Sequence, residues 1–518
     1  MPGEARKYLS TIQLDVPSML NLAEVLDRAA EKWPTKALVV DGGRRLRYEE
    51  FRTNVARWTS YLESEGVAPS DVVAVFSHNR VELLYLWIAT SRCGAIFAPF
   101  NYNLKATEIS RLVSDARPKI LFTDSDLSLE VTDAAGPKIV DFGQVSLGKP
   151  SETLVATDPD DVATLLYTSG TEDLPKGVMN THLNWFATLQ SALHDLDFAH
   201  DDVFLLSIPL YHVAGLYTFL AFSFVGATIV LGTSPTPAEI DRAIRENGVT
   251  YLIFPPTLFV ALSQYARAPY DSVKKCISFG AFISGDQFDA IARIVPSAQW
   301  RNYYGLTEST PVGTTLQPAD FASHKESIGK PHIHVGLRLV KEDGSLAGPG
   351  EVGEIHLRSP SVARGYHGQP EQTERTFGGG WLRTGDLARQ DSDGFLYFVD
   401  RKKDVVRTGG ENVSSVEVER ELLRDPRVAE AAVVGLPHSY WGEAVTAFIT
   451  PKKGAQPIDD QELTTLLKDR LASYKVPKKI VVLDALPHNP SGKVLKKELK
   501  RKFAQAYRND EPTTGPRD

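Results

Sequence analysis

The chain has 518 residues, of which 42% are hydrophobic and 24% charged, and its net charge is −8. This length exceeds what one hydrophobic core supports, so we expect at least two domains of ordinary globular composition. The acidic balance, with no dominant basic stripe, excludes a typical nucleic-acid binder. Two cysteines, Cys93 and Cys276, are too few for a disulfide framework and predict a reducing, cytoplasmic location. No apolar run approaches the ~20 residues of a membrane helix, so integral membrane association is not expected.

Short β-rich runs alternate with helical patterns through the first 400 residues. The expected strands lie at 72–76, 95–99, 228–231 and 251–254, and the expected helices at 81–91 and 237–246. Such alternation indicates layered α/β sheets. The predicted fold class is therefore α/β, with a large N-terminal domain of layered α/β subdomains.

The pattern changes near residue 400. Residues 353–358 and 394–398 look like hairpin strands, and the charge run Asp-Arg-Lys-Lys-Asp follows at 400–404. The tail then predicts helices at 415–424 and 460–471, and strands at 429–434, 444–450 and 479–483. We predict a large domain at 1–399, a linker at 400–402 and a small mobile α+β domain at 403–518. The charge run itself is either a solvated turn or a hinge.

The most informative stretch is 167–178, Tyr-Thr-Ser-Gly-Thr-Glu-Asp-Leu-Pro-Lys-Gly-Val, which follows a strand-like run at 162–166. Its hydroxyls, glycine and lysine are Thr168, Ser169, Thr171, Gly170 and Lys176. Backbone N–H groups, hydroxyls and one lysine are the chemistry of a phosphate cradle. A Walker A loop is excluded, because Gly177 and Val178 follow the lysine where that motif needs Ser or Thr. The alternative is a lysine that is only a surface cation.

A second motif is Arg-Asn-Tyr-Tyr-Gly-Leu-Thr-Glu at 301–308. Tyr304 is suited to stack on a base, Thr307 to bond a phosphate, and Glu308 to hold Mg²⁺, which prefers carboxylate oxygens. A strand-end turn with a buried tyrosine is the alternative.

Three further segments carry polar groups with competing interpretations. Asp386, in Thr-Gly-Asp, either caps a turn or accepts ribose hydroxyls. Lys493, in Ser-Gly-Lys, is by itself most simply an exposed turn lysine. His212, among the apolar residues of 209–215, is by itself most simply a core histidine.

Taken together, these motifs resemble the adenylate-forming enzymes, which include acyl-CoA synthetases, firefly luciferase and peptide-synthetase adenylation domains. The resemblance spans about residues 20–505 and follows one order along the chain. Its motifs lie at 168–177, 304–308, 384–386, 400–404 and 491–493.

The resemblance implies a role for each matching residue. The implied ATP-binding residues are Thr168, Ser169, Gly170, Thr171, Lys176, Gly280, Ala281, Tyr304, Gly305, Thr307, Asp386 and Arg401. The implied Mg²⁺ ligands are Glu308 and Thr171, and the implied catalytic residues are Lys493, His212 and Lys176. The implied acyl pocket comprises His212, Val213, Phe279 and Tyr303. Lys403 is the implied hinge, and Gly409 and Gly410 would border the coenzyme A tunnel.

The implied reaction has two steps, with ATP, Mg²⁺ and coenzyme A as cofactor and co-substrates. A carboxylate attacks the α-phosphate of ATP to give an acyl adenylate and pyrophosphate, and the thiol of coenzyme A then displaces AMP. Lys493 would serve only the first step, and the small domain would then rotate. Homodimers are common among such enzymes.

Two departures from the family pattern stand out. Glu172 and Asp173 replace the usual Thr-Gly of the phosphate loop, and Phe279 replaces a residue that is often small. We expect the acids to affect ATP binding and the ring to shorten the acyl pocket. With no acid in 209–215 to pair with an amine, an uncharged apolar acid, fatty or aromatic, is the expected substrate. A carrier-protein-loading enzyme and a non-catalytic nucleotide- or acyl-binding homologue remain the alternatives.

Overall fold

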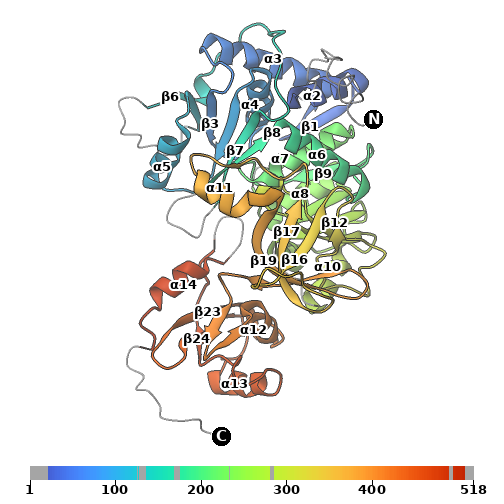
Figure 1. Cartoon of the computed structure of the whole chain (residues 1–518). Coiled ribbons are helices and arrows are strands. Elements are labelled where there is room, and N and C mark those ends of the chain that lie inside the picture. Colours follow the sequence, from blue (N-terminus) through green and yellow to red (C-terminus); the bar gives the residue numbers. More distant parts are fainter. Residues whose placement is uncertain are drawn as a thin grey trace, which may run out of the picture.

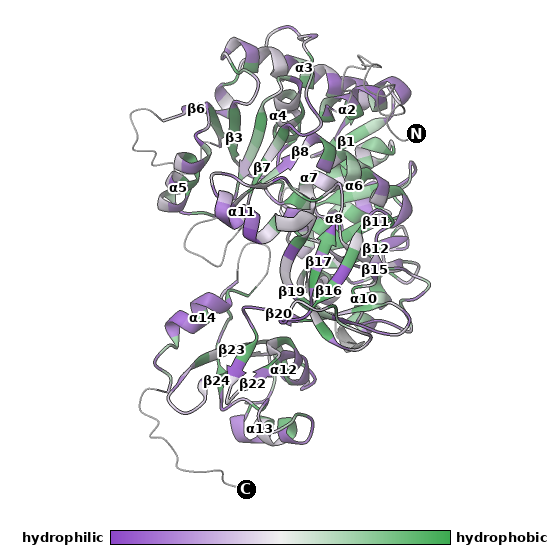
Figure 2. Ribbon diagram, in the orientation of Figure 1, coloured by the Kyte–Doolittle hydropathy of each residue, from purple (hydrophilic) through white to green (hydrophobic). Residues whose placement is uncertain are grey.

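The computed structural model describes residues 21–124, 127, 136–168, 176–232, 234–280, 285–488 and 494–507. These residues form four sheets with helices around them, and Figure 1 shows the fourth sheet in a separate body below the other three. Figure 2 shows hydrophobic residues on central strands such as β3 (Val72–Phe76) and hydrophilic residues on the peripheral helices α11 (Pro370–Phe377) and α14 (Lys496–Lys502). Within the described part of the chain, no helix has the length and apolarity needed to cross a membrane.

The first sheet has the strand order β18-β8-β7-β4-β3-β5-β6. The strands other than β3 are β4 (Ile96–Phe100), β5 (Ile120–Thr123), β6 (Lys138–Asp141), β7 (Val162–Thr168), β8 (Lys176–Thr181) and β18 (Gly365–Tyr366). The strand predicted at 95–99 is present as β4, which begins and ends one residue later than predicted. Helix α4 (Val81–Arg92) confirms the predicted helix and is buried on all sides, as expected for a helix that is apolar all round.

The second sheet has the order β15-β14-β13-β12-β11-β9-β10-β1-β2. Its strands are β1 (Ala37–Asp41), β2 (Arg44–Arg47), β9 (Val203–Leu206), β10 (Thr228–Leu231), β11 (Tyr251–Phe254), β12 (Lys275–Phe279), β13 (Gln299–Tyr304), β14 (Thr314–Leu316) and β15 (Lys330–Pro331). Both predicted strands and helix α8 (Pro237–Asn247) are confirmed. Since β12 and β13 are parallel, their carboxyl ends bring Phe279 beside Tyr303.

One continuous core joins the first two sheets. It includes Trp87 of α4, Trp185 of α6 (His182–His194) and Phe219 of α7 (Val213–Phe224). The Trp87 ring centroid lies 5.4 Å from that of Trp185 and 6.1 Å from that of Phe219. Three helices therefore fill the space between the sheets, the layered arrangement that the alternating pattern predicts.

The third sheet is antiparallel, in the order β16-β17-β19-β20. Its strands are β16 (Gly336–Val340), β17 (Val352–Arg358), β19 (Leu382–Gln390) and β20 (Leu396–Arg401). The two hairpin strands expected at 353–358 and 394–398 do not pair with each other, because β19 lies between them. Sequence periodicity identifies the strands but not their neighbours.

The fourth sheet contains β21 (Val406–Thr408), β22 (Glu411–Val413), β23 (Val428–His438), β24 (Gly442–Pro451) and β25 (Lys479–Val482). It packs with α12 (Ser415–Leu422) and α13 (Asp460–Lys468), near the ranges predicted for this tail.

The charge run at 400–404 is not uniformly solvated. Asp400 and Arg401 still belong to β20, and Asp400 is only 1% exposed. Its Oδ2 accepts a hydrogen bond from the Ser415 N–H at 2.5 Å. Lys402 and Lys403 are exposed in the turn that follows. The solvated-turn interpretation therefore holds for the lysines and is wrong for Asp400.

A buried histidine ties α6 to the second sheet. His332 Nδ1 lies 2.9 Å from Ser191 Oγ, and its Nε2 lies 2.6 Å from Thr315 Oγ1. Burial, reinforced by the neighbouring His334, lowers the pKa of His332 to about 3. The histidine is therefore neutral in the folded protein at every pH at which the protein is normally handled.

This pKa gives the protein a testable acid sensitivity. Below about pH 6.5 the unfolded chain binds a proton at His332, whereas the folded protein does not, because burial keeps the ring neutral. The free energy of unfolding therefore falls as the pH decreases from about 6.5 towards 3. His332 contributes up to about 1.4 kcal/mol per pH unit to the slope of the free energy of unfolding against pH. We expect His332→Gln to flatten this slope in urea unfolding curves measured from pH 7 to pH 4.5. An unaltered slope in His332→Gln would contradict the assignment.

Candidate functional site

Three residues of separate motifs meet at one buried carboxylate. The Tyr304 hydroxyl donates to Asp386 Oδ2 at 2.8 Å, and Arg401 Nε lies 3.2 Å from Asp386 Oδ1. Asp386 faces Arg401 because the two residues are register partners on β19 and β20. Burial and the charge of Asp386 hold the pKa of Tyr304 well above its usual range, so its hydroxyl remains a donor. The two acceptor oxygens and the tyrosine ring fit a sugar hydroxyl pair beside a planar base.

The turn before Asp386 differs from the simple cap that one interpretation of Thr-Gly-Asp predicted. The Thr384 hydroxyl donates to the Ile355 carbonyl at 2.7 Å and accepts from the Asp386 N–H at 3.1 Å. The threonine thus holds the turn, which leaves the aspartate side chain for Tyr304 and Arg401. The turn-cap interpretation of Asp386 is therefore wrong.

A second group of motif residues lies on the phosphate side. Glu308 sits in the short helix at Thr307–Ser309, and its Oε1 accepts from the Tyr366 hydroxyl at 2.9 Å. Lys176 Nζ lies 5.2 Å from the centroid of the same tyrosine ring. Tyr366 thereby connects the carboxylate to the lysine. Sequence reasoning missed Tyr366, because nothing in the sequence shows that β18 pairs with β8.

Two residues fix the shape of the Tyr-Gly-Leu-Thr-Glu turn. A Cβ at Gly305 would lie 1.4 Å from the Pro311 carbonyl oxygen, so no other residue fits there. The buried amide of Asn180 donates to the Thr307 carbonyl at 3.2 Å and to Thr310 Oγ1 at 2.7 Å. The sequence analysis also missed Asn180, because this residue lies after the phosphate loop and belongs to none of the recognised motifs.

The donor set at Glu308 fits a magnesium ion carried with a nucleotide. Among the described residues, no group of three or more His, Cys, Asp or Glu side chains could enclose a metal. Mg²⁺ usually takes one or two carboxylates and fills its other positions with waters and substrate phosphates. The single carboxylate of Glu308, with Lys176 near it, matches this type of magnesium site.

The residues expected at the acyl group lie on three elements, β12, β13 and the start of α7. Phe279 and Tyr303 are neighbours across β12 and β13, and Gly280 follows with φ +82°. His212 is the N-cap residue of α7, directly before Val213. Burial lowers the pKa of His212 to about 4, so its ring is neutral at pH 7. Its Nε2 is buried without a hydrogen-bond partner among the described residues, which differs from a satisfied core histidine.

The expected hinge and tunnel residues follow β20 along the chain. Desolvation and the neighbouring Arg401 charge lower the pKa of Lys403. Gly409 has φ +58°, and a Cβ there would lie 2.8 Å from the Trp441 ring. The Gly409 N–H donates to the Trp441 carbonyl at 2.9 Å. Gly410, at φ +87°, has open space at its Cβ position.

Several expected site residues lie outside the described residues. They are Ser169, Gly170, Thr171, Ala281 and Lys493, together with the two departures Glu172 and Asp173. Thr168, the last residue of β7, pairs with Lys176 in the register of β7 and β8. The described geometry therefore covers both flanks of the phosphate loop.

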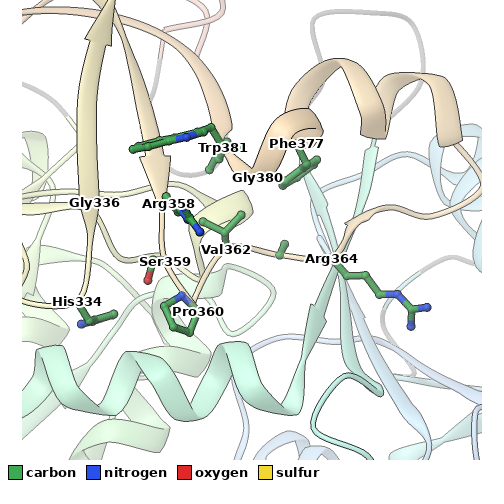
Figure 3. Close-up of a pocket in the computed structure, with 12 residues that line it drawn as sticks. His334, Gly336, Arg358, Ser359, Pro360, Val362, Arg364, Phe377, Gly380 and Trp381 are labelled. Atoms are coloured by element: carbon green, nitrogen blue, oxygen red, sulfur yellow. The ribbon is translucent and has the colours of Figure 1, made fainter. Parts of the chain in front are cut away.

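A groove of about 660 Å³ lies behind the segment that supports Glu308. Figure 3 shows Trp381 and Phe377 on one side of it and His334 and Pro360 on the other. None of the residues expected from the sequence lines this groove. The Ala363 N–H, at its wall, donates to the Glu308 carbonyl at 2.9 Å.

Comparisons with known proteins show what the whole chain is similar to. The model for the AMP-binding enzyme family matches residues 26–367, and that for the AMP-binding enzyme C-terminal domain matches residues 417–493. Feruloyl-CoA synthase from Amycolatopsis sp is 34% identical over 92% of this chain and 98% of its own. A 2-succinylbenzoate–CoA ligase from Geobacillus kaustophilus is 33% identical over 93% and 98%, respectively.

Solved structures show the same similarity. The o-succinylbenzoate-CoA synthetase from Bacillus subtilis, in complex with its acyl-adenylate intermediate, has a TM-score of 0.85 and 29% identity. The similarity covers 92% of this chain and 97% of that one. ATP-bound MatB from Rhodopseudomonas palustris has a TM-score of 0.87 and 28% identity, with 94% and 99% covered. The predicted fold class, a large α/β part followed by a small C-terminal part, is confirmed.

Proposed function

We propose, because the chain belongs to the AMP-binding enzyme family, that it activates an aromatic carboxylic acid with ATP and transfers the acyl group to coenzyme A. The family resemblance of the motifs is confirmed, and the enzyme is an AMP-forming acid–CoA ligase. The main support for an aromatic substrate comes from three relatives. A feruloyl-CoA synthase, a 2-succinylbenzoate–CoA ligase and an indoleacetate–CoA ligase are each 32–34% identical to this protein along almost the whole chain. Two aromatic residues at register-paired positions of β12 and β13, Phe279 and Tyr303, support a flat acyl group.

We propose that the nucleotide binds across the Asp386 cluster. Asp386 accepts the ribose hydroxyls, the Tyr304 ring stacks on adenine, and Arg401 supports the ribose and α-phosphate. The hydrogen bonds around Asp386 support this assignment, because they orient both carboxylate oxygens before ATP arrives. Lys176 and the loop that precedes it hold the β- and γ-phosphates.

The chemistry of activation explains the charges. A carboxylate is a poor acylating agent, and its attack on the α-phosphate brings two anions together. Lys176 and Lys493 lower that repulsion by placing positive charge where negative charge develops. Magnesium, held by Glu308 with help from Thr171, supplies further charge neutralisation when it is bound. Neutral His212 lies beside the acyl group, where it excludes water without adding a charge.

We propose that residues 1–399 and 403–518 act as two bodies joined at 400–402, with Lys403 as the hinge. Exposure of Lys402 and Lys403 in the turn after β20 supports this boundary. The small body presents Lys493 for adenylation, and Gly409 and Gly410 for thioester formation.

The location and assembly of the enzyme are also proposals. Both cysteines are buried free thiols, which supports a reducing cytoplasm, where ATP and coenzyme A are available. We also propose that the enzyme is a homodimer. Light scattering in solution should give twice the chain mass of 57.1 kDa, and a single-chain mass would contradict it.

Pyrophosphate release and AMP release together test the proposed function. We expect pyrophosphate from aromatic acids at rates well above those from fatty acids, and AMP release that depends on coenzyme A. AMP release that depends on an acyl carrier protein instead would favour the second candidate, an enzyme that loads a carrier protein. A fatty acid–carrier protein ligase from Streptomyces coeruleorubidus, 31% identical to this chain, is the observation that favours this candidate. No pyrophosphate from any acid would contradict both and favour a non-catalytic binding protein.

A further inference from the structure

One buried tyrosine contacts both charged groups of the phosphate side. Tyr366 is 5% exposed, and its hydroxyl donates to Glu308 Oε1 at 2.9 Å. Lys176 Nζ lies 5.2 Å from the centroid of the same ring. Burial and the charge of Glu308 raise the pKa of Tyr366 well above its usual range, so the hydroxyl keeps the proton that it donates. A tyrosine in this position can fix the two charged groups relative to each other.

The backbone of Tyr366 is attached to the strand that begins with Lys176. β18 pairs antiparallel with β8, and Tyr366 is the register partner of Val178. The His367 N–H donates to the Gly177 carbonyl at 2.8 Å. The lysine and the tyrosine therefore share one hydrogen-bonded strand pair, which holds them at a constant separation.

Helix α11 fixes the orientation of the tyrosine ring. Phe377 meets the ring edge-on, with the two ring centroids 5.3 Å apart. The Thr373 hydroxyl accepts a hydrogen bond from the Tyr366 N–H at 2.9 Å. A Cβ at Gly365 would lie 2.4 Å from the Thr373 side chain, so glycine is needed for the helix to come this close. The ring is thus held in place by protein groups alone.

Glu308 is fixed through its backbone and through one carboxylate oxygen. Its carbonyl accepts from the Ala363 N–H at 2.9 Å, three residues before Tyr366. Within the described part of the chain, the Tyr366 hydroxyl is the one hydrogen-bond donor to the Glu308 carboxylate. Oε1 is therefore oriented by the tyrosine, and Oε2 is available to a hard cation that prefers oxygen ligands.

We propose that Tyr366 is a positioning residue for adenylation, whose hydroxyl orients the Glu308 carboxylate for Mg²⁺ and whose ring orients Lys176 for the phosphates. This inference rests on the proposed function and adds a residue to it. A carboxylate that is already oriented loses less freedom when the metal binds, so binding is tighter. The face of the ring attracts the ammonium group without neutralising it, so the lysine keeps its charge for the phosphates.

Magnesium titrations of two variants test the two parts of this role. Tyr366→Phe keeps the ring and removes only the hydroxyl. We expect the Mg²⁺ concentration for half-maximal pyrophosphate release to rise about tenfold, as loss of one hydrogen bond to a charged group provides, while the KM for the acid stays within about twofold. Tyr366→Leu also removes the ring face and should raise the KM for ATP at saturating Mg²⁺ about fivefold.

Tyr270 provides a matched control outside the site. It is buried in the core beside the second sheet, its hydroxyl donates to Asp241 Oδ1 at 2.7 Å, and Arg245 Cζ lies 4.6 Å from its ring centroid. Tyr270→Phe therefore removes the same kind of bond from the same kind of cluster. We expect its Mg²⁺ requirement to stay within about twofold of the wild type. Equal changes in every kinetic constant of Tyr366→Phe, with a lowered Tm, would mean a purely structural role and would overturn the inference.

Failure of this inference is distinguishable from failure of the proposed function. Magnesium-dependent pyrophosphate release that Tyr366→Phe leaves unchanged would keep the ligase and remove only the role of Tyr366. Absence of pyrophosphate from the wild type with every acid would remove both.

Metal binding without turnover gives an independent measurement. Electron paramagnetic resonance of free Mn²⁺, titrated into protein saturated with α,β-methylene-ATP, yields the Kd of the metal when no pyrophosphate can be released. We expect this Kd to be about tenfold weaker in Tyr366→Phe than in the wild type and in Tyr270→Phe. Equal Kd values in all three proteins would overturn the inference.

Discussion

Replacement of Lys493 by Ala is expected to abolish adenylate formation and to spare thioester formation from a preformed acyl adenylate. The lysine bridges two anions as the carboxylate approaches the α-phosphate, and loss of such a preorganised charge typically costs about 10²–10³-fold in rate. The second step joins a thiol to a neutral acyl carbon and needs no charge at that point. Pyrophosphate release measures the first step, and thioester formation from synthetic acyl adenylate measures the second.

A matched lysine keeps this experiment specific. Lys453 is exposed on the same small body, so Lys453→Ala removes one charge without touching the site and should leave both steps within about twofold of the wild-type rates. Equal loss of both steps in Lys493→Ala would contradict the proposal that the small body presents different residues to the two reactions.

The motif residues could be predicted from the sequence because each needs a particular chemistry at a particular turn. Tyr304, Asp386 and Arg401 were expected to surround one nucleotide, and they share one hydrogen-bonded cluster. The strand end that the alternative interpretation of 301–308 expected is also present, since β13 ends at Tyr304. Local sequence is sufficient here, since the motif carries both the functional groups and the glycine that shapes the backbone.

Residues that act through long-range pairing could not be predicted in the same way. Tyr366 reaches Glu308 because β18 pairs with β8, nearly two hundred positions away in sequence. Asp400 belongs to a charge run that the sequence left as either a solvated turn or a hinge, but it is buried and accepts a hydrogen bond from the Ser415 N–H. In each case tertiary packing, which has no local signature, determines the role.

Replacement of Gly409 by Leu is expected to have the opposite effect to Lys493→Ala: adenylation persists within about threefold, and thioester formation falls about 10²-fold or more. Gly409 holds φ +58°, and even a Cβ would lie 2.8 Å from the Trp441 ring, so a leucine must displace the tryptophan or enter the space proposed for the coenzyme A tunnel. The Asp386 cluster and Lys176 lie on other elements and remain in place, so the first step is retained.

Gly454→Leu is the matched control, because Gly454 has a similar φ of +79° with open space around it. It carries the same backbone strain and blocks nothing. Single-turnover rates for each step, with the Tm of both variants, separate a blocked tunnel from a destabilised fold. A loss of adenylation as large as the loss of thioester formation in Gly409→Leu would contradict the tunnel assignment.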